Sequence, residues 1–172
     1  MYLQGKGVPQ DDKTAVKWFR LAVEQGDADA QYNLGFMYRN GYGVPQNDET
    51  AVKWYRLSAE QGNSTAQYNL GVMYESGRGV RQDDKTAVKW YRLAAEQGNA
   101  DAQYNLGNLS YFGRGVPQDN VYAYMWWNIA ASSGDKDAVN NRDIVAGKMT
   151  PADISTAQKL ARECVRKKYK GC

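Results

Sequence analysis

The sequence repeats itself at an interval of 36 residues, and this period constrains the possible fold more than any other feature. The string AQYNLG begins at residues 30, 66 and 102. Two further columns keep one residue type at the same interval: Trp18, Trp54, Trp90 and Trp126 in one, and Gly26, Gly62, Gly98 and Gly134 in the other. A fixed period of roughly 20–50 residues is typical of arrays in which each repeat buries its apolar face against its neighbours. We therefore expect a single repeat array.

Each repeat has the pattern of two helices joined by a loop. Apolar residues recur at helical spacing around Leu34 in DADAQYNLGFMYRNG, and again around Trp54 in DETAVKWYRLSAEQG. The loop GYGVPQ lies between them, and its glycines and proline break helices. Glycines such as Gly26 suit the left-handed residue that ends a second helix, and the residue after each can cap the next first helix. We predict that the second helices are themselves capped by Asp12, Asp48, Asp84 and Asn120.

The interior of the array can also be predicted from the columns. The tryptophans lie on the apolar stripe of the second helices, so we expect Trp54→Ala or Trp90→Ala to cost about 3–5 kcal/mol, as truncations of buried aromatic side chains do. Glycine inside a helix costs about 1 kcal/mol relative to alanine. We therefore expect a neighbouring helix to approach closely at the glycines that lie inside the first helices, Gly35, Gly71 and Gly107.

The repeat resembles a known family. Leu34-Gly35-x-x-Tyr38 and Ala15-x-x-x-Phe19 match parts of the tetratricopeptide signature. The longer segment AQYNLGFMYRNGYGVPQNDETAVKWYRLSAEQG resembles the Sel1-like repeat, a tetratricopeptide relative with a G-x-G-V loop and a closing E-Q-G. The resemblance implies an all-α fold, a right-handed α-solenoid of antiparallel helix pairs. The ending of the chain is similar to that of bacterial members of the family.

We predict one Sel1-like repeat array over residues 1–172. Its parts are a partial repeat (1–26), three full repeats (27–62, 63–98 and 99–134), a degenerate repeat (135–149) and a C-terminal capping helix (150–172). Thr150, Pro151 and Asp153 give the last helix a capping residue, a proline in the first turn and an acidic side chain three residues after the cap.

The beginning of the array has no cap of its own. Met1 and Tyr2 align with Met37 and Tyr38, near the end of a first helix. A repeat array normally carries a specialised cap at each end. We therefore expect a longer natural protein, and we expect that neighbouring molecules can associate end to end near Trp18.

The composition gives no indication of catalysis or of a nucleic-acid partner. Histidine is absent, which removes the usual proton-transfer residue near neutral pH and the commonest metal ligand. The net charge is +3, too small an excess to require nucleic acid or a membrane surface. Paired carboxylates such as Asp83 and Asp84 recur where helices begin, and capping explains them better than acid–base chemistry. We expect no enzyme activity, no cofactor, no metal, no nucleic acid and no membrane span.

A partner-binding face can be placed by helical geometry and by the resemblance together. Tyr32, Phe36 and Arg39 lie on the side of the first helix opposite to Leu34. The resemblance implies that first helices line a concave groove, which makes these residues and their counterparts the candidates: Tyr32, Phe36, Arg39, Tyr68, Val72, Glu75, Tyr104, Asn108 and Tyr111. The invariant tyrosines among them either recognise a peptide or pack between neighbouring helices, and both interpretations stay open.

These features predict a non-catalytic scaffold that binds a protein or peptide along the concave surface. The resemblance offers one alternative, a cell-envelope protein with the β-lactam-binding or β-lactam-hydrolysing activity that is linked to cysteine-rich relatives. The absence of a histidine base argues against it.

Both cysteines, Cys164 and Cys172, lie near the C-terminus. Eight residues of continuous helix would separate them by about 12 Å, too far for a disulfide, unless the helix ends near Tyr169 and the chain turns at Gly171. Cysteine-rich members of the family similarly place pairs about eight residues apart. We favour a disulfide, and with it a periplasmic or secreted location. The alternative is two free thiols, with Cys164 packed as a small apolar residue, and a cytoplasmic location stays open.

Overall fold

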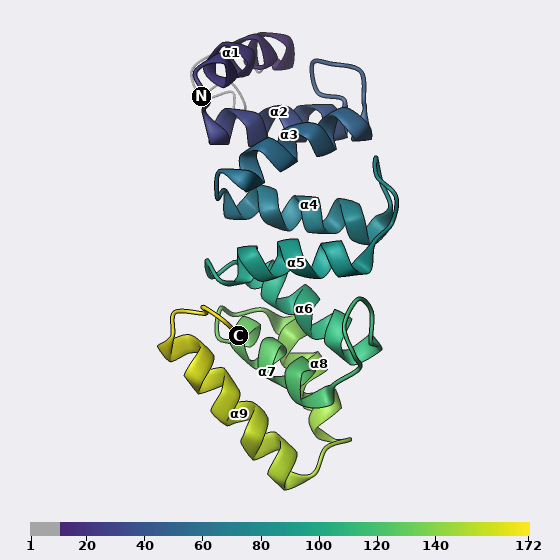
Figure 1. Ribbon diagram of the computed structural model, residues 1–172, viewed down its shortest axis with the longest axis vertical. Coiled ribbons are helices and arrows are strands. Elements are labelled where there is room, and N and C mark those ends of the chain that lie inside the picture. The colour runs from purple at the N-terminus through teal and green to yellow at the C-terminus, as the bar shows by residue number, and fades with distance from the viewer. Residues whose placement is uncertain (1–10) are drawn as a thin grey trace. The chain divides into compact units, whose positions relative to one another are not determined.

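The computed structural model describes residues 11–172, which form nine helices and no strand (Figure 1). This confirms the predicted all-α architecture. The helices are α1 (Asp12–Glu24), α2 (Ala28–Asn40), α3 (Asp48–Glu60), α4 (Ser64–Ser76), α5 (Asp84–Ala95), α6 (Ala100–Phe112), α7 (Asn120–Ala131), α8 (Lys136–Ala146) and α9 (Pro151–Arg166). The predicted alignment of Met1 and Tyr2 with the end of a first helix lies outside the described residues.

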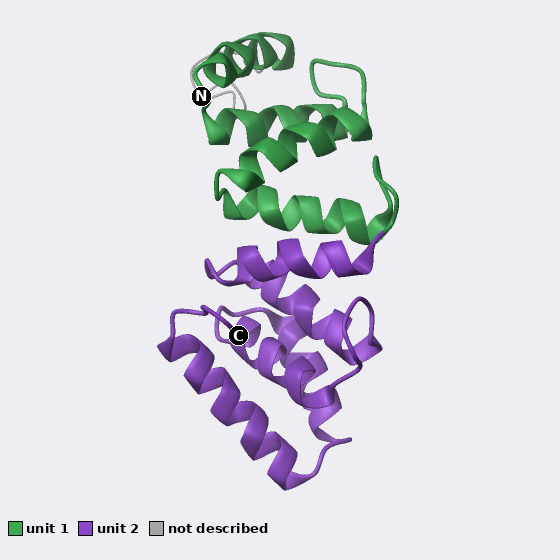
Figure 2. Ribbon diagram, in the orientation of Figure 1, with its two compact units in different colours: residues 1–82 green, residues 83–172 purple. Residues whose placement is uncertain are grey.

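The chain divides into two compact units, each of which is described by itself (Figure 2). Unit 1 comprises residues 1–82 and contains α1 to α4, and consecutive helices pack against one another. Unit 2 comprises residues 83–172 and contains α5 to α9. There α7 packs against α6, α8 and α9, so that the last helix covers a helix two positions back in the chain.

The caps of the first helices are confirmed. The side chains of Asp27, Asn63 and Asn99 accept a hydrogen bond from the backbone N–H three residues later, at 2.8, 2.8 and 2.9 Å. The glycine before each cap has a positive φ of 79° to 94°. These bonds satisfy donors that the first turn of a helix would otherwise leave unpaired.

The caps predicted for the second helices were wrong by one residue. The capping residues are Asp11, Asn47, Asp83 and Asp119, whereas Asp12, Asp48, Asp84 and Asn120 already have helical backbone. Each cap is directly followed by a second Asp or Asn, so residue type alone cannot distinguish the two positions. The shift has a consequence, because it leaves the carboxylates of Asp48 and Asp84 available for other contacts.

The core contains the residue that follows the tryptophan in three of the repeats: Tyr55, Tyr91 and Trp127. Tyr55 and Tyr91 are completely buried and Trp127 is 3% exposed, whereas Trp54 and Trp90 are half-buried. Trp18 is 55% exposed, and only Trp126 of the tryptophan column is buried. The expectation that the tryptophans form the core was therefore wrong for the first three repeats. One residue is a rotation of about 100° around a helix, and the apolar stripe in the sequence spans both positions.

Two glycines inside first helices lie against this core column, as predicted. A Cβ atom added to Gly35 would lie 2.6 Å from the Tyr55 ring, and one added to Gly107 would lie 2.5 Å from the Trp127 indole nitrogen. Real Cβ atoms do not approach other atoms so closely. Each glycine thus gives up some helix propensity so that a large ring can pack against the helix backbone.

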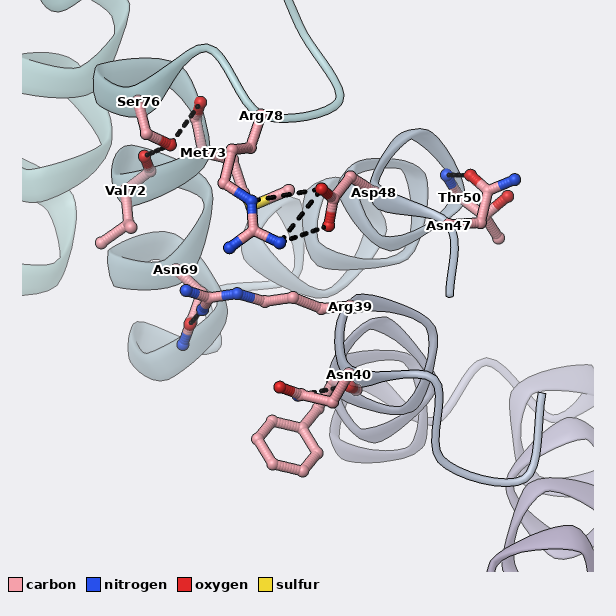
Figure 3. A network of polar contacts seen from close by, with 11 residues as sticks. Arg39, Asn40, Asn47, Asp48, Thr50, Asn69, Val72, Met73, Ser76 and Arg78 are labelled. Atoms are coloured by element: carbon pink, nitrogen blue, oxygen red, sulfur yellow. Dashed lines mark hydrogen bonds and ion pairs between the residues drawn. The ribbon is translucent and has the colours of Figure 1, made fainter. Parts of the chain in front are cut away.

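The loops connect each repeat to the one before it. Gly79 has a φ of +67°, and a Cβ atom there would lie 2.4 Å from the backbone carbonyl carbon of Asp48. Beside it, the guanidinium of Arg78 makes a bidentate ion pair with the Asp48 carboxylate at 3.1–3.2 Å (Figure 3). In unit 2, Gly115 and Arg114 make the same contacts with Asp84.

Further bonds within unit 1 span the same interval of 30 residues. The Ser58 hydroxyl donates to the Ala28 carbonyl oxygen at 2.6 Å, and the Gln61 side chain donates to that of Gln31 at 2.8 Å. Both bonds join α3 and its C-cap to α2 within the repeat 27–62, so the buried Ser58 hydroxyl has the partner that its burial requires.

The C-terminus closes on itself. Helix α9 has Thr150 as its cap, as predicted, and ends at Arg166; Thr150 and Asp153 form a capping box. Lys168 and Tyr169 then have left-handed backbone, with φ of 53° and 66°, and bring Cys172 back to Cys164. The two cysteines form a disulfide with their Cα atoms 5.6 Å apart, which confirms the favoured pairing. The turn also contacts the residue that caps the C-terminus of α5, because the Gly171 N–H donates to the Glu96 carboxylate at 3.2 Å.

Candidate partner-binding surface

All nine candidate residues lie on first helices and are half-buried. Tyr32, Phe36 and Arg39 come from α2, Tyr68, Val72 and Glu75 from α4, and Tyr104, Asn108 and Tyr111 from α6. The first two sets belong to unit 1 and the third to unit 2. Their role in binding stays a prediction, and their geometry is described one unit at a time.

In unit 1, an arginine links α2 to α4. The Arg39 guanidinium donates a hydrogen bond of 2.8 Å to the side-chain oxygen of Asn69 (Figure 3). The Asn69 amide nitrogen donates in turn to the Thr65 carbonyl oxygen at 2.9 Å, which holds the amide in position. Arg39 thus lies in a fixed place between two first helices, with part of its side chain open to solvent.

The same part of unit 1 contains a buried hydroxyl without a partner. The ring of Tyr32 packs against the ring of Tyr55, with centroids 5.9 Å apart. The Tyr55 hydroxyl is buried, and no group of the described residues meets hydrogen-bond geometry with it, although the Arg39 guanidinium lies near enough to lower its pKa. Burial raises the pKa of Tyr55 to about 12, although the positive charge of Arg39 acts in the opposite direction. Burial also raises the pKa of Tyr32, again opposed by Arg39.

This hydroxyl predicts a change of stability with pH. A phenol with a raised pKa keeps its proton in the folded state between pH 10 and about 12 while the unfolded chain loses it, so stability is full below pH 10 and falls across that interval. Tyr55→Phe should raise the free energy of unfolding at neutral pH by about 1 kcal/mol, because it removes an unpaired buried group. It should also reduce the loss of stability between pH 10 and 12, measured by urea denaturation.

Tyr124→Phe is the matched control. Tyr124 is buried, but its hydroxyl accepts a hydrogen bond from the Gln158 amide at 3.3 Å. Its removal should lower the free energy of unfolding by about 1 kcal/mol. If Tyr55→Phe destabilises the protein as much as Tyr124→Phe does, the Tyr55 hydroxyl has a partner in solution.

In unit 2, the candidate residues of α6 contact the helices that follow. The Tyr104 hydroxyl accepts from the Asn141 amide at 3.2 Å, and the Asn108 side-chain oxygen accepts from the Trp127 indole N–H at 3.2 Å. The Lys148 ammonium lies 5.0 Å from the centre of the Tyr111 ring and donates to its hydroxyl. The α6 part of the face is therefore largely engaged by residues of α7, α8 and the loop after α8.

Within residues 11–172, no three His, Cys, Asp or Glu side chains come together in a way that could hold a metal ion. None of the helices in the described part of the chain is long and apolar enough to cross a membrane. Ser133 and Lys136 have the spacing S-x-x-K, but Ser133 follows the end of α7 and Lys136 begins α8, with Gly134 at a φ of 90° between them. Both side chains are exposed, so the pair lacks the packed setting that activates a nucleophile.

Sequence reasoning missed one recurring contact. The Arg20 guanidinium donates to the Tyr38 hydroxyl at 3.0 Å, and the Arg56 guanidinium donates to the Tyr74 hydroxyl at 2.6 Å. Each bond ties a second helix to the first helix that follows. The signal was present in the columns, because both the arginines and the tyrosines recur at the 36-residue interval.

Comparisons with known proteins agree with this architecture. The Sel1 repeat matches residues 1–27, 28–63, 64–99 and 100–135. A protective antigen of uropathogenic Escherichia coli that displays an SLR fold is 36% identical, with a TM-score of 0.89, over 98% of this chain and 36% of that chain. A Sel1 repeat protein from Oxalobacter formigenes is 39% identical, with a TM-score of 0.76, over 80% of this chain and 55% of that chain.

Helicobacter pylori cysteine rich protein B shares the fold, with 24% identity and a TM-score of 0.60 over 79% of this chain and 98% of that chain. The chain thus spans 36% and 55% of the length of the first two solved structures. No curated protein matches the chain.

Proposed function

The chain belongs to the Sel1 repeat family, whose members are generally non-catalytic protein-interaction scaffolds, and on this premise we propose that it binds a protein or peptide along the exposed side of its first helices. The binding residues would be the nine candidates on α2, α4 and α6. Their exposed side would provide tyrosine rings and hydroxyls, one arginine and a set of side chains that differ from repeat to repeat.

The observation that supports this proposal most is the contrast between neighbouring columns of the first helices. The buried column keeps one residue type, as Leu34, Leu70 and Leu106 show. The half-buried columns vary instead, with Phe36, Val72 and Asn108 in one and Arg39, Glu75 and Tyr111 in another. Packing alone would favour the same solution in every repeat. Half-exposed aromatic residues and arginine are also the residue types enriched where proteins bind one another.

Tyr68 of unit 1 and Tyr104 of unit 2 occupy the same position of the repeat, and their substitution tests the proposal. A partner is first captured from native extract, identified by mass spectrometry, and prepared in pure form. Tyr68→Ala with Tyr104→Ala should then weaken its binding by about 30-fold or more in calorimetry, which corresponds to about 2 kcal/mol. The loss in free energy of unfolding should be smaller than the loss in binding.

Leu57→Ala serves as the control, because Leu57 is exposed on the second helix α3. It should leave the affinity for the same partner unchanged. Equal losses of binding and of stability in the tyrosine variant would assign the rings to the packing between helices and contradict the proposal.

The cysteine chemistry supports a proposal about location. Disulfides form and persist in oxidising compartments, and the Cys164–Cys172 disulfide therefore favours one. We propose a periplasmic or secreted location on this ground.

A further inference from the structure

The contact between arginine and tyrosine that recurs in unit 1 is absent from unit 2. Arg92 occupies on α5 the position that Arg20 has on α1 and Arg56 on α3. Its partner position on α6 contains Ser110 in place of a tyrosine. The Ser110 hydroxyl donates to the Leu106 carbonyl oxygen of its own helix at 2.8 Å. Arg92 makes no side-chain hydrogen bond or ion pair within residues 11–172.

A pocket lies where the missing ring would be. Its volume is about 230 Å³, and both Arg92 and Ser110 line it. Val88 and Leu106 provide apolar walls, and the buried Trp126 belongs to the same lining. An apolar cavity of about 150 Å³ is enough to hold a benzene ring. The pocket is therefore large enough for a phenol, and it combines apolar walls with one cation.

The corresponding place in unit 1 shows what the tyrosine does. A hollow lies there too, lined among others by Val52, Arg56 and Val80. The counterparts of Leu106 and Ser110, which are Leu70 and Tyr74, do not line it. Where a tyrosine is present, it bonds to the arginine and the hollow does not reach the first helix behind it. Where serine replaces it, the pocket extends to that helix.

The charges at the pocket indicate what kind of group can enter. The carboxylate of Asp119 belongs to the lining, but it accepts the backbone N–H groups of Val121 and Tyr122 at 2.8 and 3.1 Å as the cap of α7. Both of these N–H groups bond to Oδ1 of Asp119, and Arg92 is the cation among the lining residues of the described pocket. An occupant needs an apolar ring for the walls and an acceptor atom for the guanidinium.

We propose that this pocket binds a tyrosine side chain of a partner peptide, with the phenol ring between Val88, Leu106 and Trp126 and its hydroxyl accepting a hydrogen bond from Arg92. The bonds of Arg20 to Tyr38 and of Arg56 to Tyr74 are the internal precedents for this pairing. The site shares no residue with the nine candidates on the exposed side of the first helices. It therefore does not depend on the function proposed above.

The first test compares three small probes on the whole chain. N-acetyl-tyrosinamide, N-acetyl-phenylalaninamide and N-acetyl-leucinamide are titrated, and the shift of the Trp126 indole N–H signal is followed by NMR. The tyrosine probe should bind about tenfold more tightly than the phenylalanine probe, because only the former has a ring hydroxyl that can accept from Arg92 inside the pocket. The leucine probe should bind most weakly. Equal affinities for the three probes would overturn the proposal.

The second test uses variants that restore or remove single parts of the site. Ser110→Tyr should fill the pocket, pair with Arg92 and abolish binding of the tyrosine probe, whereas Ser110→Ala should leave it intact. Arg92→Gln should lower the affinity for the tyrosine probe about tenfold, to that of the phenylalanine probe. Arg56→Gln, which removes an arginine that already has a partner, is the control and should change neither affinity.

Two further outcomes would contradict the proposal. Wild-type affinity in Ser110→Tyr would place the probe elsewhere, and if that variant does not fold, Arg92→Gln decides the question alone. A dimer in sedimentation that disappears in Ser110→Tyr would make a second copy of the chain the occupant. Tyr104→Ala should leave binding of the probe unchanged, which separates this site from the face of the first helices.

Discussion

Tyr55→Ala is expected to lower the free energy of unfolding by about 3–5 kcal/mol, the range for truncation of a large buried aromatic side chain. Tyr55 is completely buried, and its ring lies against the backbone of α2 at Gly35. Truncation would leave a cavity between α2 and α3, which pack directly against each other. Urea denaturation followed by circular dichroism would measure the change.

Trp54→Ala is the neighbouring comparison and should cost less, about 1–2 kcal/mol, because a half-buried side chain loses less buried surface and leaves no closed cavity. The larger side chain is thus expected to give the smaller loss. If Trp54→Ala lowers the free energy of unfolding as much as Tyr55→Ala does, the more deeply buried side chain does not contribute more to stability.

The second large effect is expected at Gly79. Gly79→Ala should lower the free energy of unfolding by about 3 kcal/mol or more, from two causes. A left-handed backbone costs an L-residue about 1–2 kcal/mol, and the new Cβ atom would also lie 2.4 Å from the Asp48 backbone. The overlap is with backbone, so relief requires the loop to move away from α3 and to disturb the pair of Arg78 with Asp48.

Gly62→Ala separates these two causes. Gly62 has a φ of +94°, but a Cβ atom there would meet nothing within 4 Å. The expected loss is about 1–2 kcal/mol, from the backbone conformation alone. Equal losses at Gly62 and Gly79 would show that the loop of one repeat does not have to lie against the helix of the repeat before it.

Much of the fold could be predicted because the helices are short, periodic and punctuated by glycine. The caps at Asp27, Asn63 and Asn99 are confirmed, and each is the residue directly after the glycine with a positive φ that ends the preceding segment. The caps of the second helices were misplaced where two polar residues stand together. Which of two adjacent aromatic residues enters the core depends on how far the helix is rotated about its axis. Packing sets that rotation, and the width of an apolar stripe does not determine it.

The candidate surface was less predictable than the fold. Rotation from Leu34 identifies which side chains leave the core, and all nine candidates are indeed half-buried. The partners of these side chains come from elsewhere in the chain. Asn69 is 30 residues from Arg39, and Lys148 is 37 residues from Tyr111. Such pairs depend on the packing of whole helices, and helical geometry within one segment cannot indicate them. The substitution at Ser110 could be found by comparing columns, but its effect requires the contact of Arg56 with Tyr74 as a reference.

The bonds of Ser58, Gln61, Arg78 and Arg114 each span 30 residues. This regular interval affects how the number of repeats can change during evolution. The bonds of Ser58 and Gln61 stay within one repeat, and those of Arg78 and Arg114 reach the preceding repeat and no further. A gene duplication or deletion of 36 codons would therefore recreate the same bonds at the new junction and leave the others intact. The number of repeats can drift by whole steps, while a gain or loss of a single residue within a loop would displace an arginine from its aspartate.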